Sequence, residues 1–462
     1  YGDHRDLHRL IRRQRQMCIR DRCRKEYDDD SEYRLQCDGE KEGEHGPALL
    51  QAVYEKKQIE VKKELPGIFM YVDWLPVGSF FIDTVDYKLG RPYCYKSKGL
   101  AKRLGLKELY IAFSGYWPEK GALLLTRTFK EFECQASIVR YLKNNLDKNP
   151  LPQIISSVGN TGNGYNLITH LLGLPLYLVI PETGLDKLLL PFQTKPFLIV
   201  VKGDYSDAIK MADKIACRTG LVRDGGTRNI ARRAGLGSVM LHAVAHPEQG
   251  SGQLFDHYFQ AIGSGTGAIG AWEAVQLLLA DGRFGDTVTK IHIAQNIPFT
   301  PIVDSWEKGQ RSLIEIPDNL AKEKIYSVTA DVLTNRNPPY SIAGGVFDVL
   351  TASKGSAWKV NNYQVFHAAR MFRESEGVDV GPAAAVAIDA LRQAVLSGCV
   401  KRDERILLHI TGGGKEIQYS RGPVYQVKPN VVVKPKQIDY AIEKIGKPLR
   451  IIEPKNFLKQ YE

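Results

Sequence analysis

A glycine-rich loop at 262–270 is the clearest candidate for ligand chemistry in this sequence. It follows an aromatic and apolar run, 257–262, that predicts a buried strand, and the apolar spacing of 268–281 predicts a helix. Such a loop presents free backbone N–H groups and the positive end of a helix dipole to an anion. Phosphate is the natural ligand, although a lone loop of this kind is more often an ordinary tight turn. The residues that would form the cradle are Gly263, Ser264, Gly265, Thr266 and Gly267.

Lys130 is a candidate nucleophile. It lies where a predicted strand, 121–128, is followed by a predicted helix, 130–142. The positive end of the helix dipole opposes an ammonium group there, and burial would oppose it too, so that both lower the pKa of the amine. A neutral amine attacks carbonyl groups. The alternative is a solvated lysine in the first helical turn, which is the commoner case for an isolated residue.

Two more polar positions follow predicted strands. After the strand 153–157, a turn carries Ser157, Asn160 and Thr161, whose N–H groups suit a carboxylate and whose Asn160 amide suits an oxyanion. After the strand 406–410, Thr411 precedes the glycines 412–414, and its hydroxyl at the end of a buried strand needs a partner. The alternatives are plain turn chemistry for the first position and a backbone-bonded threonine for the second.

Alternating strands and helices predict a parallel α/β fold, in which ligands bind at the carboxyl ends of the strands. Further strands are predicted at 176–180, 197–201 and 288–294, and further helices at 165–172, 206–217 and 382–396, with Gly220 as a helix C-cap. The four candidate places together suit a cofactor with a phosphate, an aldehyde, a phenolate and a ring nitrogen. Pyridoxal phosphate has all four groups.

Composition narrows the class of protein. The chain has 462 residues and a net charge of +11, but residues 1–26 alone carry nine Lys/Arg and four Asp/Glu. Because no basic block with interleaved aromatics occurs in the remainder, we expect no nucleic-acid partner. No stretch is apolar enough for a membrane span and no signal pattern is visible, so we expect no membrane partner and a cytoplasmic location. Seven scattered cysteines without a Cys-x-x-Cys pair predict neither a disulfide framework nor a metal site.

We expect residues 1–40 to be a poorly ordered appendage because they are polar and lack periodicity. The run 12–22 resembles translated sequencing-adaptor read-through, and residues 1–26 are therefore left out of the functional argument. The predicted domains are a large cofactor-binding domain, 41–130 with 226–462, and a small α/β domain, 131–225.

Several motifs in this order carry a family resemblance. The lysine at 130, the pattern Ser-x-Gly-Asn-Thr-Gly at 157–162, Gly-Ser-Gly-Thr-Gly at 263–267 and the threonine at 411 resemble the type II, or tryptophan-synthase-β, family of pyridoxal-phosphate enzymes. Longer phrases at 113–122, 256–261, 332–336 and 338–341 are similar to those of the cysteate synthases of methanogenic archaea, a group related to threonine synthases. The resemblance spans about 33–414. It implies two parallel α/β domains with the site between them.

The resemblance also implies roles for the candidate residues. Lys130 would hold pyridoxal phosphate as a Schiff base and move the Cα proton, and Asn160 would bond the 3′-oxygen. The 263–267 loop would hold the phosphate, and Thr411 would face the ring nitrogen. Ser157 and Thr161 would bind the substrate. One departure stands beside the lysine, where relatives often read Lys-Asp-Arg and this chain has Lys-Glu-Phe.

The implied reaction is a β-replacement in coenzyme M biosynthesis, in which O-phospho-L-serine and sulfite give L-cysteate and phosphate. Because both reactants are anionic, the pocket needs cations, and the candidates are Arg228, Arg232 and Arg336. The alternative for Arg232 is a solvated helix face. A family zinc cluster is in doubt because only Cys23 and Cys37 remain and Arg20 stands at a ligand position.

Other functions stay open on sequence grounds. A threonine synthase would act on O-phosphohomoserine, and a non-catalytic protein on the same scaffold would bind a phosphate ligand without chemistry. The sequence does not distinguish sulfite from sulfide as the nucleophile. We expect a homodimer or a higher homo-oligomer.

Overall fold

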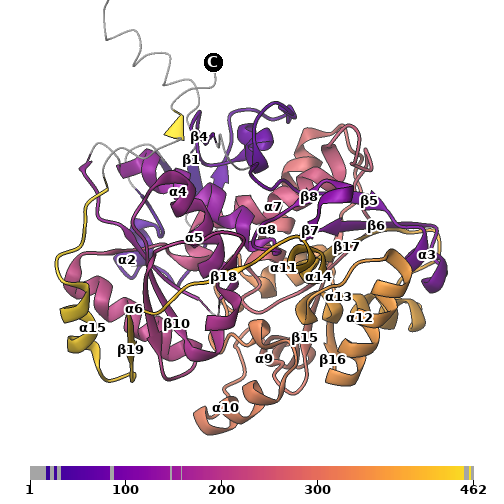
Figure 1. Ribbon diagram of the computed structural model, residues 1–462. Coiled ribbons are helices and arrows are strands. Elements are labelled where there is room, and N and C mark those ends of the chain that lie inside the picture. The colour runs from indigo at the N-terminus through magenta and orange to yellow at the C-terminus, as the bar shows by residue number, and fades with distance from the viewer. Residues whose placement is uncertain are drawn as a thin grey trace, which may run out of the picture.

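Two parallel sheets form the framework of the molecule. The computed structural model describes residues 17–20, 25–28, 33–83, 88–145, 148–157, 159–451 and 457–458. Among these residues, the larger sheet has six strands in the order β16-β15-β14-β17-β6-β5 and the smaller has five in the order β13-β9-β10-β12-β19. The two sheets lie in opposite halves of the molecule (Figure 1). All strand pairs in both sheets are parallel except β5 with β6.

The strands of the larger sheet are β5 (Cys94–Lys96), β6 (Glu108–Phe113), β14 (His257–Ala261), β15 (Lys290–Asn296), β16 (Ala357–Val360) and β17 (Arg405–Ile410). Those of the smaller sheet are β9 (Gln153–Ser156), β10 (Tyr177–Pro181), β12 (Phe197–Val201), β13 (Val222–Arg223) and β19 (Val431–Val433). The other strands are β1 (Met17–Arg20), β2 (Glu26–Asp28), β3 (Leu50–Val53), β4 (Phe81–Ile82), β7 (Tyr116–Trp117), β8 (Ala122–Leu123), β11 (Leu189–Leu190), β18 (Tyr425–Gln426) and β20 (Phe457–Leu458).

The longer helices are α4 (Lys130–Asn145), α5 (Asn160–Leu172), α6 (Tyr205–Thr219), α7 (Ile230–Ala245), α8 (Thr266–Asp281), α12 (Asn362–Glu376) and α13 (Pro382–Leu396). The shorter ones are α2 (Asp38–Lys41), α3 (Gly99–Leu104), α9 (Pro301–Glu307), α10 (Asp318–Ser327), α11 (Val346–Ser353), α14 (Lys415–Ser420) and α15 (Ile438–Ile445). Five 3₁₀ helices complete the described elements: η1 (Gly67–Trp74), η2 (Pro118–Lys120), η4 (Glu182–Lys187), η5 (Gly226–Arg228) and η6 (Asp331–Leu333).

The helices α4, α5, α7 and α8 lie between the two sheets and share one hydrophobic core with them. This core joins Ile155 and Leu178 of the smaller sheet to Tyr258 and Ile291 of the larger one. The backbones of α7 and α8 approach closely, because a Cβ at Gly270 would lie only 2.2 Å from the carbonyl oxygen of Arg233. The outer face of the larger sheet is covered by α12 and α13, and that of the smaller sheet by α6 and α15 (Figure 1). The central helices therefore join the two sheets through one hydrophobic core.

Most predicted elements are confirmed, with shifts of a few residues. The helix 382–396 is found with those bounds, and the predicted C-cap Gly220 has a φ of 76°. The predicted strand 121–128 is wrong. Only β8 is extended there, in a hairpin with β7, and the chain then turns so that Arg127 has a φ of 60°. Leu124 and Leu125 continue the apolar run, but they pack from a loop and not from a sheet. The sequence reading also missed β5 and β6.

Part of the expected N-terminal appendage is ordered. Tyr33 donates a hydrogen bond to the Asp224 carbonyl at 3.1 Å and packs edge-on against Tyr141, and Cys37 is 1% exposed. Residues 33–40, where the sequence predicts poor order, therefore contact residues far along the chain. Residues 1–16, 21–24 and 29–32 lie outside the described residues, so the interpretation of 12–22 stays a prediction.

The smaller sheet takes its edge strand from the C-terminal part of the chain. β19 pairs with β12, and α15 packs against α6. The sequence predicts residues 226–462 as part of the large domain, whereas β19 within that range pairs with the smaller sheet. No helix within the described ranges combines the length and apolar character needed to cross a bilayer.

Candidate active site

A cavity of about 530 Å³ lies at the carboxyl ends of strands from both sheets. β9 ends just before Ser157, β14 just before the glycine-rich loop, and β17 just before Thr411, as parallel α/β construction requires. The cavity brings together most of the predicted site residues: Lys130, Ser157, Asn160, Thr161, Arg232, Gly263, Ser264, Gly265, Thr266, Gly267 and Thr411. Its size is in the range of small-molecule sites.

Lys130 is the first residue of α4, and its amine faces a carboxylate. The Nζ atom lies 3.3 Å from Oε2 of Glu133, one helical turn on, and 4.8 Å from the ring centre of Phe129. Burial lowers the pKa of Lys130, although the carboxylate opposes that shift. The N–H of Phe129 donates to the Thr411 carbonyl at 3.1 Å, so the lysine is held beside the end of β17. The predicted position and the predicted direction of the pKa shift both agree with this geometry.

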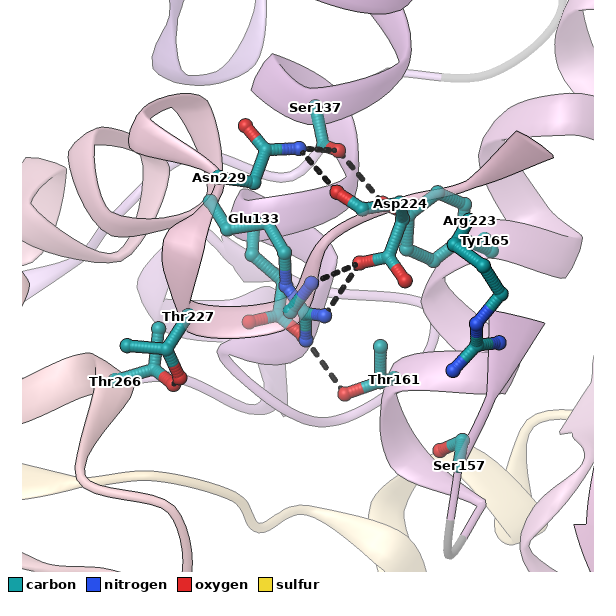
Figure 2. Close-up of polar contacts among 12 residues, drawn as sticks. Glu133, Ser137, Ser157, Thr161, Tyr165, Arg223, Asp224, Thr227, Asn229 and Thr266 are labelled. Atoms are coloured by element: carbon teal, nitrogen blue, oxygen red, sulfur yellow. Dashed lines mark hydrogen bonds and ion pairs between the residues drawn. The ribbon is translucent and has the colours of Figure 1, made fainter. Parts of the chain in front are cut away.

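The 263–267 loop has the form expected of an anion cradle. Gly265 has a φ of 83° and is the N-cap of the long helix α8. A Cβ at Gly267 would lie 2.4 Å from the Gln260 side-chain nitrogen, so only glycine lets the backbone approach the cavity here. The hydroxyl of Thr266 lies 2.6 Å from that of Thr227 (Figure 2). It also lies 2.8 Å from the hydroxyl of Ser264. Backbone N–H groups, a helix dipole and hydroxyls therefore meet at one place.

A buried histidine supports the floor of the cavity below Thr411. The His409 ring lies 5.0 Å from the Phe129 ring, its Nε2 is 2.9 Å from the Ser114 hydroxyl and its Nδ1 is 2.8 Å from the Tyr258 hydroxyl. Burial, with a smaller contribution from the charge of Lys130, lowers the pKa of His409 to about 3. At neutral pH the ring is therefore uncharged and keeps the two hydroxyls and Phe129 in place.

Arg232 forms a buried network beside Lys130 with two carboxylates, those of Glu133 and Asp224, which Figure 2 shows. Glu133 accepts hydrogen bonds from the Thr161 hydroxyl at 2.7 Å and from Arg232 Nη2 at 2.6 Å, and the other terminal nitrogen of Arg232 donates to Asp224 at 2.6 Å. Burial alone would raise the pKa of Glu133, but the charges of Arg232 and Lys130 outweigh it and the pKa lies below its usual value. The network fixes the acid in its ionised form.

Comparison with known proteins gives the family. The family model described as "Pyridoxal-phosphate dependent enzyme" matches residues 90–412. A cysteate synthase of Methanosarcina acetivorans is 41% identical over 89% of this chain and 95% of its own, and one of Methanoculleus marisnigri is 42% identical over 84% and 87%. This chain belongs to the cysteate synthase family of pyridoxal-phosphate-dependent enzymes.

Solved structures agree on the fold. An aspartate racemase that depends on pyridoxal 5′-phosphate matches with a TM-score of 0.55 at 14% identity, over 71% of this chain and 91% of its own. A threonine deaminase of Solanum lycopersicum matches with a TM-score of 0.52 at 16% identity, over 79% and 96%. The type II fold predicted from sequence, with its two parallel α/β sheets, is thus confirmed.

The residues at the cavity fit the cofactor of the cysteate synthase family. The glycine-rich cradle would hold its phosphate, the amine of Lys130 its aldehyde carbon, and Asn160 and Thr411 line the space between them. Ser157 has a different immediate role, because its hydroxyl accepts from the N–H groups of Gly159 and Gly162 at 3.0 Å each and so shapes the turn. The hydroxyl of Thr161 likewise donates its hydrogen bond to Glu133.

The structure places the three arginines predicted to bind substrate in three different environments. Arg228 does not line the cavity and pairs with Glu40 at 2.7 Å. Arg336 pairs with Asp204 at 2.9 Å and lines a separate cavity of about 310 Å³. Arg232 does line the candidate site, but both of its terminal nitrogens are taken by carboxylates. The structure therefore brings neither Arg228 nor Arg336 to the place where we expected them to bind substrate.

Three basic residues of the cavity wall were missed. Lys187 bridges to Asp331 at 2.6 Å, and Arg127 and Lys415 lie on the wall near Thr411. The sequence carried a signal for two of them, because Arg127 precedes Lys130 by three residues and Lys415 directly follows the glycines 412–414. In the described part of the chain, no group of three or more His, Cys, Asp or Glu residues could hold a metal ion. Cys23 lies outside that part, and the Cys37 sulfur is 3.4 Å from His45.

Proposed function

We propose that this chain is a cysteate synthase that exchanges the phosphate of O-phospho-L-serine for sulfite and releases L-cysteate. The observation that carries the proposal is the Lys130 amine, with its lowered pKa, facing the same cavity as the glycine cradle, in a chain 41% identical to a cysteate synthase over 89% of its length. The bound cofactor would supply the electron sink for the Cα carbanion.

Lys130 and Glu133 would together carry out the transfer of the Cα proton. The lowered pKa favours the neutral form of Nζ, which would take the proton from Cα of the amino acid and return it after the new bond forms. When Nζ carries that proton, Oε2 of Glu133 at 3.3 Å accepts a hydrogen bond from it. Because Arg232 holds Glu133 ionised, the carboxylate stabilises the ammonium without taking the proton for itself.

The other residues of the cavity wall would orient the substrate and the cofactor and would shield the Lys130 amine. The N–H groups of Gly159 and Gly162 donate to the Ser157 hydroxyl, so the carboxylate of the amino acid would bind through the other N–H groups of that turn. The neutral hydroxyl of Thr411 would face the ring nitrogen of the cofactor. A hydroxyl would not hold that nitrogen protonated, which favours rapid loss of the β-substituent over long storage of charge at Cα. Phe129, packed on the uncharged His409, would shield the amine from water.

Product analysis tests the proposal. The purified protein, loaded with pyridoxal phosphate, is incubated with O-phosphoserine and sulfite, and cysteate is followed by mass spectrometry with phosphate by colorimetry. Equal amounts of both products are expected. Turnover of O-phosphohomoserine in preference would select a threonine synthase, sulfide in place of sulfite would select cysteine formation, and ligand binding without turnover would select a non-catalytic protein.

Two expectations from the sequence stay predictions. The cytoplasmic location is one, testable by fractionation of the producing cells. The homo-oligomeric state is the other, and light scattering of the purified holoenzyme would measure it.

A further inference from the structure

The positive charges of the cavity wall fall into two classes. Its basic residues are Arg127, Lys130, Lys187, Arg232 and Lys415. Three of them have carboxylate partners within 3.3 Å: Lys130 with Glu133, Lys187 with Asp331, and Arg232 with both Glu133 and Asp224. Across the described residues, Arg127 and Lys415 have no carboxylate within ion-pair distance. These two remain available to an anion that enters the cavity.

Arg127 and Lys415 converge on one aromatic ring. The Arg127 guanidinium lies 5.2 Å from the ring centre of Tyr419, and the Lys415 ammonium lies 5.3 Å from the same centre. Cation–π attraction stabilises each one, but two like charges that share a ring also repel each other. An anion between them would remove that repulsion. We call Arg127, Lys415 and Tyr419 the basic clamp.

The backbone fixes the two halves of the basic clamp relative to each other. The Gln418 side-chain amide donates to the Leu125 carbonyl at 2.9 Å, which ties α14 to the loop before Lys130. The Gly413 N–H donates to the Arg127 carbonyl at 3.1 Å. Asp379 also lines this wall, but its carboxylate accepts from the backbone N–H groups of Lys415 and Glu416 at 2.9 and 3.2 Å. The neighbouring acid is thus engaged by the backbone.

Arg127 also has two locally unfavourable features, one in its backbone conformation and one in its hydrogen bonding. Its φ of 60° is a left-handed conformation that side chains other than glycine and asparagine adopt at a cost. Its Nη1 atom is buried and has no hydrogen-bond partner among the described residues, and neither has the buried hydroxyl of the adjacent Thr128. Buried donors without partners are unusual in folded proteins. Both residues line the cavity within three residues of Lys130, so a ligand bound there would lie next to these unpaired donors.

We infer that the basic clamp is the subsite for a compact dianionic oxyanion, separate from the glycine cradle that would hold the cofactor. The guanidinium matches tetrahedral or pyramidal oxyanions with paired N–H donors. Two sources share this chemistry: the phosphate of the amino-acid substrate and the incoming sulfite. The naming of these sources rests on the proposed function, whereas the oxyanion site itself rests on the geometry alone.

The test compares charge removal inside and outside the cavity. Arg127→Gly removes the cation and suits the backbone, because glycine adopts a φ of 60° freely. Lys415→Met removes the second cation. Lys120→Met is the matched control, since Lys120 makes the same kind of contact, 5.7 Å from the Trp117 ring centre, but does not line the cavity. Arg127→Lys keeps the charge and loses the paired donors.

Sulfate binding to the holoenzyme is measured first, by calorimetry, because it needs no turnover. We expect the sulfate dissociation constant to rise about 10- to 100-fold in Arg127→Gly, less in Lys415→Met and Arg127→Lys, and not at all in Lys120→Met. Parent-like sulfate binding in both Arg127→Gly and Lys415→Met would overturn the inference. Circular dichroism confirms that each variant is folded, and Arg127→Asn replaces the glycine variant if that one is not.

Steady-state kinetics then identify the source of the oxyanion. A higher KM for sulfite with an unchanged KM for O-phosphoserine would assign the basic clamp to the nucleophile, and the reverse would assign it to the leaving phosphate. If the parent enzyme makes no cysteate but loses sulfate binding on Arg127→Gly, the proposed function fails and the oxyanion subsite stands. If it makes cysteate and neither KM nor sulfate binding changes, only the subsite fails.

Discussion

The two walls of the cavity use positive charge in different ways. On the wall formed by α4 and α7, Arg232 gives both terminal nitrogens to carboxylates, and Glu133 in turn meets Lys130 and Thr161. On the wall formed by α14 and the loop before α4, Arg127 and Lys415 share only an aromatic ring. Charges already neutralised inside the protein can position other groups. Charges without partners are the ones that can bind a ligand.

Removal of the reactive amine should have the largest effect. We expect Lys130→Ala to lower kcat for cysteate formation by about 10⁴-fold, because this one amine would both hold the cofactor and move the Cα proton. Product assays measure the loss, and borohydride trapping with peptide mapping shows whether position 130 carries the cofactor. A labelled peptide from elsewhere in the parent enzyme would contradict the assignment.

Removing the buried ion pairs of Arg232 should lower the stability of the fold. Arg232→Met leaves the carboxylates of Glu133 and Asp224 buried without their cation, and the free energy of unfolding should fall by about 3–5 kcal/mol. Urea denaturation followed by circular dichroism measures it. The double variant Arg232→Met with Glu133→Leu should recover part of the loss, because one of the stranded charges is removed. If the single variant is as stable as the parent, the network does not stabilise the fold.

The glycine cradle offers a test of cofactor binding that leaves both charged walls intact. In Gly267→Ala the new Cβ would lie 2.4 Å from the Gln260 amide and 2.8 Å from the Phe129 ring. Either the loop or these side chains must shift, and we expect the dissociation constant for pyridoxal phosphate to rise by about 10- to 100-fold. Cofactor titration by absorbance measures it. Gly46→Ala, where a Cβ would meet nothing within 4 Å, is the control.

Acid should weaken the floor of the cavity through His409. An unfolded histidine binds a proton below about pH 6.5, whereas the pKa of His409 in the folded protein is about 3. The unfolded state therefore binds more protons between these values, and the free energy of unfolding falls as the pH drops, by up to about 1.4 kcal/mol per pH unit for this residue. Denaturation at pH 7.5 and 5.5 should show a smaller drop in His409→Gln. The exposed His367→Gln should behave like the parent.

An exposed ion pair should have the smallest effect. Arg370 and Glu374 lie 2.7 Å apart one turn from each other on α12, but the arginine side chain is 82% exposed. We expect Arg370→Ala to lower the free energy of unfolding by less than about 0.5 kcal/mol, because water competes for both charges. A loss as large as that of Arg232→Met would mean that burial is not what separates the two kinds of pair.

The sequence was informative where chemistry is local. A few neighbouring residues are enough to predict Lys130, the 157–162 turn and the 263–267 loop, because the start of a helix and a glycine turn are both encoded locally. The arginines were harder, since the partners that neutralise them are distant: Glu133 lies 99 positions before Arg232, and Glu40 lies 188 before Arg228. A sequence shows that a residue is charged but not whether the fold has already paired it.

The prediction of a strand at 121–128 is wrong for a related reason. Its leucines indicate burial, and burial in a strand and burial in a loop leave the same apolar pattern over so few residues. The turn there depends on contacts to 411–413, almost 300 residues away, which no local pattern reveals.

The late arrival of β19 has a consequence for synthesis. Residues 431–433 close the edge of a sheet whose other strands all lie between 153 and 223, so the ribosome makes more than 200 residues before that edge is covered. During this interval β12 presents unpaired N–H and C=O groups to any extended segment nearby. The nascent chain must therefore protect an incomplete sheet for much of its translation.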